Sequence, residues 1–207
     1  MINPQEKERL LAVYEKNKPT IAAFLKKTKN ADDRHILAEL MFCLQTAQSS
    51  AKSARNTINK LKEKNVLFTA SESEILEMME GVRFADKKAG YLYRARAKLP
   101  EIKSRLGSDP KELRAWLVDN IDGMGPKLAS HFLRNIGVFG LAILDVHVQN
   151  FLKRNGLLVG EVGKLKLHQY GENETVFLKL ADELKIPPQE LDIAIWMLGN
   201  GSGEFYG

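Results

Sequence analysis

Apolar residues recur at intervals of three and four along most of this 207-residue chain, and that spacing limits the fold more than any other feature. Residues spaced in this way lie on one face of an α-helix, which must be buried against another helix. Five segments carry the pattern, namely 36–44, 54–61, 113–117, 176–184 and 191–198. Strand-like alternation is scarce, with 138–144 as the nearest candidate. The sequence therefore predicts an all-α protein.

Helix-start signals support this prediction. Segments 3–6, 71–74 and 109–112 each place an N-cap residue before a carboxylate in the first helical turn. The first and last of them also have a proline at the first helical position, where its missing N–H costs nothing. We expect the helix that follows 71–74 to stop at Gly81.

A hairpin between two helices is predicted in the middle of the chain. One helix ends near Asn120, and two glycines, Gly123 and Gly125, follow with one residue between them. Pro126 then starts a second helix, which Gly137 closes in the usual C-terminal position.

Two glycines so close together allow the backbone to approach another chain and to point its N–H groups outward. Free amides at a helix start bind anions, and the backbone phosphate of DNA is the natural one. The pattern over about 111–137 is that of the helix-hairpin-helix element, with a plain helix-loop-helix turn as the alternative.

Lys127 lies in the first turn of the second helix, where the helix dipole disfavours a cation by about 0.3–1 kcal/mol. The same field and partial burial favour the neutral amine. A neutral lysine can attack a sugar carbon and form a Schiff base. A charged lysine here would instead contact a phosphate, and position alone does not separate the two roles.

Asp145 follows four apolar residues, Leu141 to Leu144, which makes a plain surface role a poor explanation. It can cap the helix that begins around Val146, because aspartate is a favoured N-cap. A cap at the edge of a cleft can still direct one carboxylate oxygen at a substrate, so capping and catalysis are compatible.

Charge and composition indicate the class of partner. The net charge is +5, which favours a polyanionic partner. Seven basic residues between 87 and 105 form either a DNA-facing surface or a solvated helix face. The single cysteine, Cys43, lies in an apolar run and is expected to be buried, and one cysteine cannot hold an iron–sulfur cluster. No signal peptide and no apolar run of ~20 residues is present, so we expect a cytoplasmic protein.

Two segments carry a family resemblance. Residues 123–135 have the sequence Gly-Met-Gly-Pro-Lys-Leu-Ala-Ser-His-Phe-Leu-Arg-Asn, and 141–147 the sequence Leu-Ala-Ile-Leu-Asp-Val-His. Together they resemble the 8-oxoguanine DNA glycosylase/AP lyases of the archaeal type. Residues 42–48, 82–84 and 190–196 resemble further segments of that family in the expected order.

The resemblance implies a two-lobed helix-hairpin-helix glycosylase fold with the active site between the lobes. It implies one domain over 1–207, made of two helical sub-lobes with interleaved boundaries. In the implied reaction the damaged nucleotide leaves the duplex, and Lys127 attacks C1′ and expels the oxidised base. The resulting imine permits β-elimination, which nicks the strand. Asp145 activates Lys127 or stabilises positive charge on the sugar.

The resemblance also implies a base pocket. Phe84 and Trp196 match positions that stack on the flipped base, with core packing as the alternative for both. Asp192 lies one helical turn before Trp196 and can accept hydrogen bonds from the guanine edge. Gln48 matches the residue that fills the gap in the duplex, where archaeal relatives tend to carry asparagine.

Contacts with the DNA backbone are implied for Gly123, Gly125 and His147, although a histidine at a helix start is as often structural. The chain departs from the archaeal pattern at Val146, where arginine is common. It also ends at Gly207 instead of at the lysine whose carboxylate reads the base.

The implied partner is double-stranded DNA that contains 8-oxoguanine or abasic sites, bound by a nucleoid-associated monomer. No cofactor or side-chain metal site is required, and the superfamily often holds K⁺ or Na⁺ at hairpin carbonyls. The alternatives are a related glycosylase/lyase for another damaged base and a non-catalytic DNA-binding module. A non-catalytic DNA-binding module would leave Asp145 without an obvious role.

Overall fold

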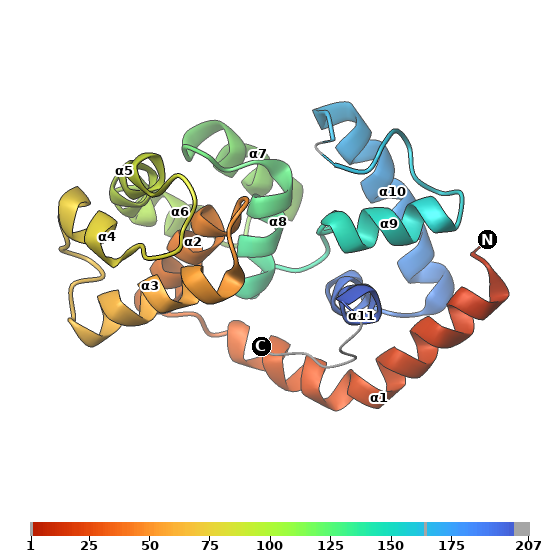
Figure 1. Cartoon of the computed structure of the whole chain (residues 1–207). Helices are drawn as coiled ribbons and strands as arrows, with labels where there is room; N and C mark the ends of the chain where they lie inside the picture. The colour runs from red at the N-terminus through yellow and green to blue at the C-terminus, as the bar shows by residue number, and fades with distance from the viewer. Residues whose placement is uncertain (1, 164, 201–207) are drawn as a thin grey trace. The chain divides into compact units, whose positions relative to one another are not determined.

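The computed structural model describes residues 2–163 and 165–200, and this part of the chain contains eleven helices and no strand. The predicted all-α class is therefore confirmed. The strand candidate 138–144 is an irregular segment whose residues Leu141 to Leu144 are buried. In chain order the helices (Figure 1) are α1 (Pro4–Thr28), α2 (Asp33–Thr46), α3 (Ala51–Glu63), α4 (Glu72–Met78), α5 (Ala85–Arg96), α6 (Leu99–Arg105), α7 (Pro110–Asn120), α8 (Pro126–Asn135), α9 (Val146–Arg154), α10 (Leu167–Leu184) and α11 (Pro188–Asn200).

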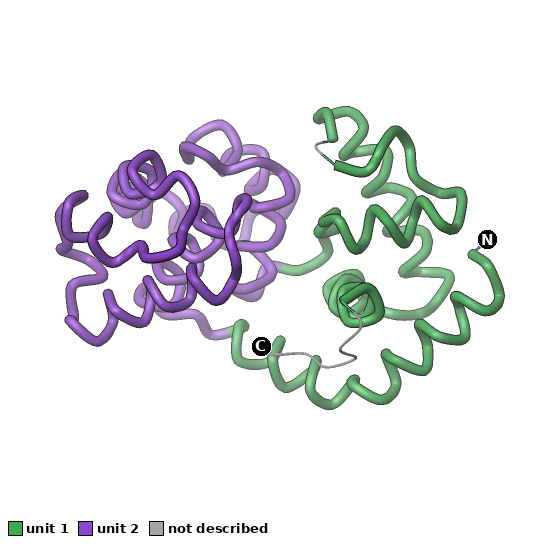
Figure 2. The backbone as a smooth tube through the Cα atoms, viewed as in Figure 1, with its two compact units in different colours: residues 1–29, 139–207 green, residues 30–138 purple. Residues whose placement is uncertain are grey.

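The chain divides into two compact units (Figure 2). Unit 1 combines both ends of the chain, Met1–Lys29 and Phe139–Gly207, and unit 2 is the continuous segment Asn30–Val138. The expectation that 1–207 acts as one glycosylase domain stays a prediction. None of the described helices has the length and apolar character of a membrane span.

The three predicted N-caps are present. The side chain of Asn3 accepts a hydrogen bond from the N–H of Gln5, and that of Asp109 accepts two from the start of α7. Ser71 and Glu74 form the reciprocal capping box. Helix α4 nevertheless ends at Met78, earlier than the predicted stop at Gly81, because the N–H of Met79 bonds to the carbonyl of Leu76 in a tighter turn.

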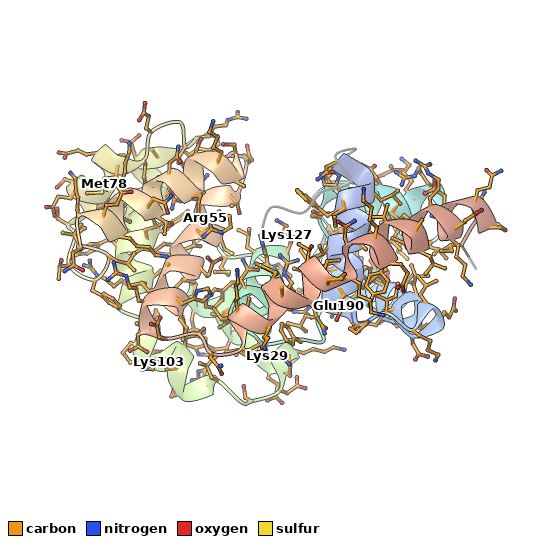
Figure 3. The ribbon with its side chains drawn as sticks, turned by 90° about the horizontal axis from the view of Figure 1, so that it is seen from below. Lys29, Arg55, Met78, Lys103, Lys127 and Glu190 are labelled. Carbon is orange, nitrogen blue, oxygen red and sulfur yellow. The ribbon has the colours of Figure 1, made fainter. Side chains whose placement is uncertain are left out.

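Helix α11 lies at the centre of unit 1, where α1, α9 and α10 pack against it. A hydrogen bond of 2.7 Å from the hydroxyl of Tyr14 to Oε2 of Glu190 joins α1 to α11 (Figure 3 labels Glu190). Burial and the Glu190 carboxylate raise the pKa of the Tyr14 phenol. The two ends of the chain thus depend on each other for a shared core.

Helix α2 is the corresponding centre of unit 2, and every residue from Ile36 to Gln45 is buried. Cys43 is buried as predicted, and its burial raises the pKa of the thiol. The helix also buries the carboxylate of Glu39, which accepts hydrogen bonds of 2.8 Å from Arg55 on α3 and from Asn135 at the end of α8. A buried charge is costly unless it is paired in this way.

Candidate active site

The helix-hairpin-helix element has the predicted boundaries. Helix α7 ends at Asn120 and α8 begins at Pro126. At the other end of α8, Gly137 has a φ of +84°, and the N–H groups of Gly137 and Val138 bond to the carbonyls of Arg134 and Leu133. This is the Schellman arrangement, so the predicted role of Gly137 is confirmed.

The two hairpin glycines have different reasons to be glycine. Gly123 has a φ of +78°, and a Cβ at this position would lie 2.6 Å from Cδ2 of Tyr91. Its neighbour Asp122 accepts a hydrogen bond of 2.8 Å from Nε of Arg94. Gly125 faces open space, since nothing lies within 4 Å of an added Cβ. Helix α5 therefore holds the first glycine in place, and the second leaves the backbone open to a partner.

The start of α8 has the character of an anion site. Gly125 is its N-cap residue and has no side chain to satisfy the helix amides. Among the described residues no hydrogen bond is formed by the N–H of Gly125, Lys127 or Leu128. Unpaired amides at a helix N-terminus carry partial positive charge and bind phosphate or carboxylate groups.

Lys127 is the second residue of α8 and is half-buried (labelled in Figure 3). Its ammonium forms no hydrogen bond or ion pair with any residue in the described part of the chain. Its charge contributes to the lowered pKa of the His131 ring and partly opposes the rise that burial causes in the pKa of the Cys43 thiol. An amine without an intramolecular partner is available to a ligand.

His131, one helical turn after Lys127, is a feature that sequence reasoning left without a role. Its ring meets Phe42 edge-on at 6.2 Å, and its Nδ1 is buried without a hydrogen-bond partner among the described residues. Burial, with Arg134, Lys127 and Arg55 nearby, holds the pKa of the imidazole well below its usual range. The four-residue spacing from Lys127 was the available sequence signal, because it puts both side chains on one helix face.

Asp145 caps α9, as the sequence allowed. Its Oδ1 accepts a hydrogen bond of 2.9 Å from the N–H of Val148. Its Oδ2 has no hydrogen-bond partner in the described chain, and the residue is half-buried. Capping therefore occupies one carboxylate oxygen and leaves the other available.

Three further residues of unit 1 lie on α9 and α11. The ring of His147 meets Trp196 edge-on, with centroids 6.3 Å apart. The same ring lies so close to Gly199 that an added Cβ would be 2.7 Å from its Nδ1. Trp196 is half-buried beside the core of unit 1, and Asp192 is buried. His147 and Trp196 thus form one aromatic pair against a bare helix backbone.

Gln48 and Phe84, both in unit 2, have left-handed backbones, with φ of +56° and +58°. Both side chains are exposed, and Phe84 is 59% exposed. Core packing is therefore excluded as the explanation for Phe84. Residues other than glycine seldom adopt this conformation, and they concentrate at functional sites.

The basic stretch between 87 and 105 is largely exposed, with one exception, and whether it faces DNA stays a prediction. Lys88 is buried. Arg94, Lys98 and Lys103 pair with Asp122, Glu101 and Asp33. Two of these carboxylates, Asp122 and Asp33, lie outside the stretch, whereas Glu101 lies one helical turn after Lys98. Lys87 at the start of α5 is exposed.

The predicted site residues fall into two sets. Unit 2 contains the hairpin glycines, Lys127, Gln48 and Phe84, and unit 1 contains Asp145, His147, Asp192 and Trp196. No group of three or more histidine, cysteine or acidic residues within 2–163 and 165–200 could hold a metal ion. The terminal residue Gly207 lies outside the described residues.

A helical fold with a glycine hairpin, an unpaired lysine at the following helix start and an aspartate cap defines the helix-hairpin-helix class of DNA glycosylases. The model of the family described as 8-oxoguanine DNA glycosylase matches residues 17–186. The chain belongs to this family.

Individual relatives agree with that assignment. The 8-oxoguanine DNA glycosylase/AP lyase of Korarchaeum cryptofilum is 33% identical over 177 residues, which is 84% of each chain. The crystal structure of the 8-oxoguanine DNA glycosylase of Thermotoga maritima is similar with a TM-score of 0.85 and 32% identity, over 96% of this chain and 98% of that one.

A Methanocaldococcus jannaschii 8-oxoguanine glycosylase/lyase in complex with a 15mer DNA containing 8-oxoguanine is similar with a TM-score of 0.84 and 29% identity. The similarity covers 96% of this chain and 99% of that one.

We predict that acid destabilises the protein through His131. Its folded-state pKa is lowered, so below the unfolded pKa of about 6.5 the unfolded chain binds a proton that the native protein does not. The free energy of unfolding should then fall by up to about 1.4 kcal/mol per pH unit as the pH drops from 6.5. Denaturant unfolding of His131→Gln between pH 7 and 5.5 should show a flatter slope.

The matched control is His168→Gln, which removes an exposed histidine of α10 and should keep the wild-type slope. Identical slopes for His131→Gln and the wild type would contradict the assignment.

We predict opposite outcomes for two glycine-to-alanine changes inside helices. The Cβ added by Gly171→Ala in α10 would point into open space, so this change should raise the free energy of unfolding by about 1 kcal/mol, the usual gain in helix propensity. Gly199→Ala in α11 should give no gain, because its Cβ must displace His147. Thermal unfolding of both variants measures the difference, and an equal gain at both sites would show that His147 moves freely.

Proposed function

We propose that the chain is a bifunctional base-excision repair enzyme, a DNA glycosylase and AP lyase that removes 8-oxoguanine, with Lys127 as nucleophile and Asp145 as its catalytic partner. The observation that carries the proposal is the unpaired ammonium of Lys127 beside unpaired amides at the start of α8. An anion site and a nucleophile within one helical turn suit attack on a sugar beside a phosphate.

Lys127 acts once it has lost a proton. Its Nζ forms a bond to C1′ of the flipped nucleotide while the bond from C1′ to the base nitrogen breaks, and the electron pair leaves with the base. The C1′–O4′ bond of the sugar ring then breaks, O4′ takes up a proton and C1′ forms a Schiff base with Nζ. Loss of a C2′ proton from this Schiff base breaks the C3′–O bond and expels the 3′ phosphate. These steps make one residue responsible for excision and for strand cleavage.

Asp145 supplies a carboxylate to this reaction. Its Oδ1 is fixed by the α9 cap, so Oδ2 can accept a proton from Lys127 or face the positive charge that develops on the sugar. Negative charge held in position before the reaction stabilises such a transition state more than a mobile side chain does.

Base and backbone contacts complete the proposal. Phe84 and Trp196 stack on the base, Asp192 accepts hydrogen bonds from its edge, and Gln48 enters the gap in the duplex. The amides around Gly123 and Gly125, together with His147, contact the phosphates.

The partner is double-stranded DNA with 8-oxoguanine or abasic sites, and the enzyme acts as a monomer associated with the nucleoid. A K⁺ or Na⁺ ion at the hairpin would use backbone carbonyls, of which that of Ile121 already accepts the N–H of Met124. The reaction needs no chemistry from that ion.

We expect Lys127→Gln to abolish covalent trapping. Borohydride reduces a Schiff base to a stable amine, so the wild type should form a trapped complex with an 8-oxoguanine duplex and the variant should form none. Gel electrophoresis of the reduced complex measures this. A wild type that traps thymine glycol but not 8-oxoguanine would change the substrate, and a wild type that traps no damaged duplex would favour the DNA-binding module.

We expect Asp145→Asn to lower the excision rate by about 100-fold or more while DNA affinity persists. Asparagine caps helices as well as aspartate does, so the variant removes the charge and keeps the start of α9. Single-turnover excision and equilibrium DNA binding measure the two effects. Loss of binding together with activity would assign Asp145 a structural role only.

A further inference from the structure

Lys88 on α5 is a lysine whose ammonium is held inside unit 2. Its side chain is buried, and its Nζ donates hydrogen bonds to the carbonyls of Gln45 at 2.8 Å and Ala47 at 2.6 Å and to Oγ of Ser49 at 3.0 Å. Three acceptors use all three ammonium protons. Burial and the nearby Arg83 lower the pKa of this lysine.

The three acceptors surround one residue, Gln48. They belong to the last turn of α2 and to the turn that follows it, and Gln48 lies between Ala47 and Ser49. Lys88 therefore donates hydrogen bonds to the backbone carbonyl of the residue before Gln48 and to the side chain of the residue after it. Gln48 itself is exposed and left-handed, a conformation that a glutamine does not favour without support.

The same contacts reach Phe84. The N–H of Lys88 bonds to the carbonyl of Phe84 in the first turn of α5, and the N–H of Arg83 bonds to Oγ of Ser49 at 2.9 Å. Ser49 thus joins the turn after α2 to the segment that enters α5. Gln48 and Phe84 are therefore connected through Lys88 and Ser49.

A cap for the end of α2 would not need this arrangement. A backbone turn or a surface lysine could satisfy the carbonyls of Gln45 and Ala47 without the desolvation of an ammonium. Backbone strain at exposed side chains, held by a buried charge, is typical of preorganised functional sites.

We propose that Lys88 is a positioning residue, which fixes Gln48 and Phe84 in their protruding conformations before DNA binds. The proposal rests on the proposed function, because it takes Gln48 as the residue that enters the duplex and Phe84 as the one that stacks on the base. Lys88 acts through these two side chains and touches neither the sugar nor the base.

The test compares two substrates of Lys88→Met, which keeps the apolar stem and removes the ammonium. Excision from an 8-oxoguanine duplex requires base flipping, whereas β-elimination at an abasic site in a single strand leaves no gap to fill and no base to stack. We expect the single-turnover rate on the duplex to fall about tenfold or more and the single-strand rate to stay within about twofold of the wild type.

Lys60→Met is the matched control, because it removes the same charge from an exposed pair with Glu80 in the same unit and should leave both rates unchanged. Equal losses on both substrates, or no loss on the duplex, would overturn the proposal for Lys88.

A double-mutant cycle with Gln48→Ala tests independently whether Lys88 acts through Gln48. If Lys88 acts largely through Gln48, Lys88→Met should cost less on the duplex in the Gln48→Ala background than in the wild type. Losses that simply multiply would indicate general destabilisation and overturn the proposal.

If Lys88→Met does not fold, Ser49→Ala replaces it, since it removes one of the three acceptors and keeps the lysine. We then expect the same loss on the duplex alone, but of smaller size. A variant whose rates on the two substrates are unchanged, or fall by the same factor, would overturn the proposal. Failure of the proposed function is distinct, because it would appear in the wild type as an absence of excision from the 8-oxoguanine duplex.

Discussion

The carboxylate of Glu39 is the interaction on which the arrangement of unit 2 depends. It lies on the most buried helix of the unit and joins that helix to α3 through Arg55 and to the end of α8 through Asn135. Apolar packing alone would allow α8 to slide or rotate, whereas the directed hydrogen bond from Asn135 to a buried charge favours one register of α8 against α2. Because α8 is one helix, the position of its last residue also sets the position of its start, where Lys127 lies.

Helix α5 organises the side of unit 2 that is proposed to meet DNA. Along the helix, Lys88 supports the turn that contains Gln48, Tyr91 packs on Gly123, and Arg94 pairs with Asp122. Two successive spacings of three place these side chains along one side of the helix. One helix therefore supports the hairpin that suits phosphate, the residue proposed to enter the gap in the duplex and the residue proposed to stack on the displaced base.

Local chemistry in the sequence predicted much of this structure. The caps at Asn3 and Asp109 and the closing turn at Gly137 depend on neighbouring residues, so their signals are complete within a few positions. Lys88 looked like surface charge because its three acceptors lie about forty positions earlier in the chain. No sequence pattern indicated the burial of His131 either, since the ring that it meets, Phe42, lies on a helix distant in the sequence. Partners distant in sequence leave no local pattern.

The interleaving of the two units determines the order in which they can form. Unit 2 is one continuous segment, whereas α1 of unit 1 packs on α11, the last helix of the described chain. During synthesis, residues 30–138 can complete their core while α1 still lacks its partner. The unit that contains the proposed nucleophile can therefore fold before unit 1, whose core requires a contact between the two ends of the described chain.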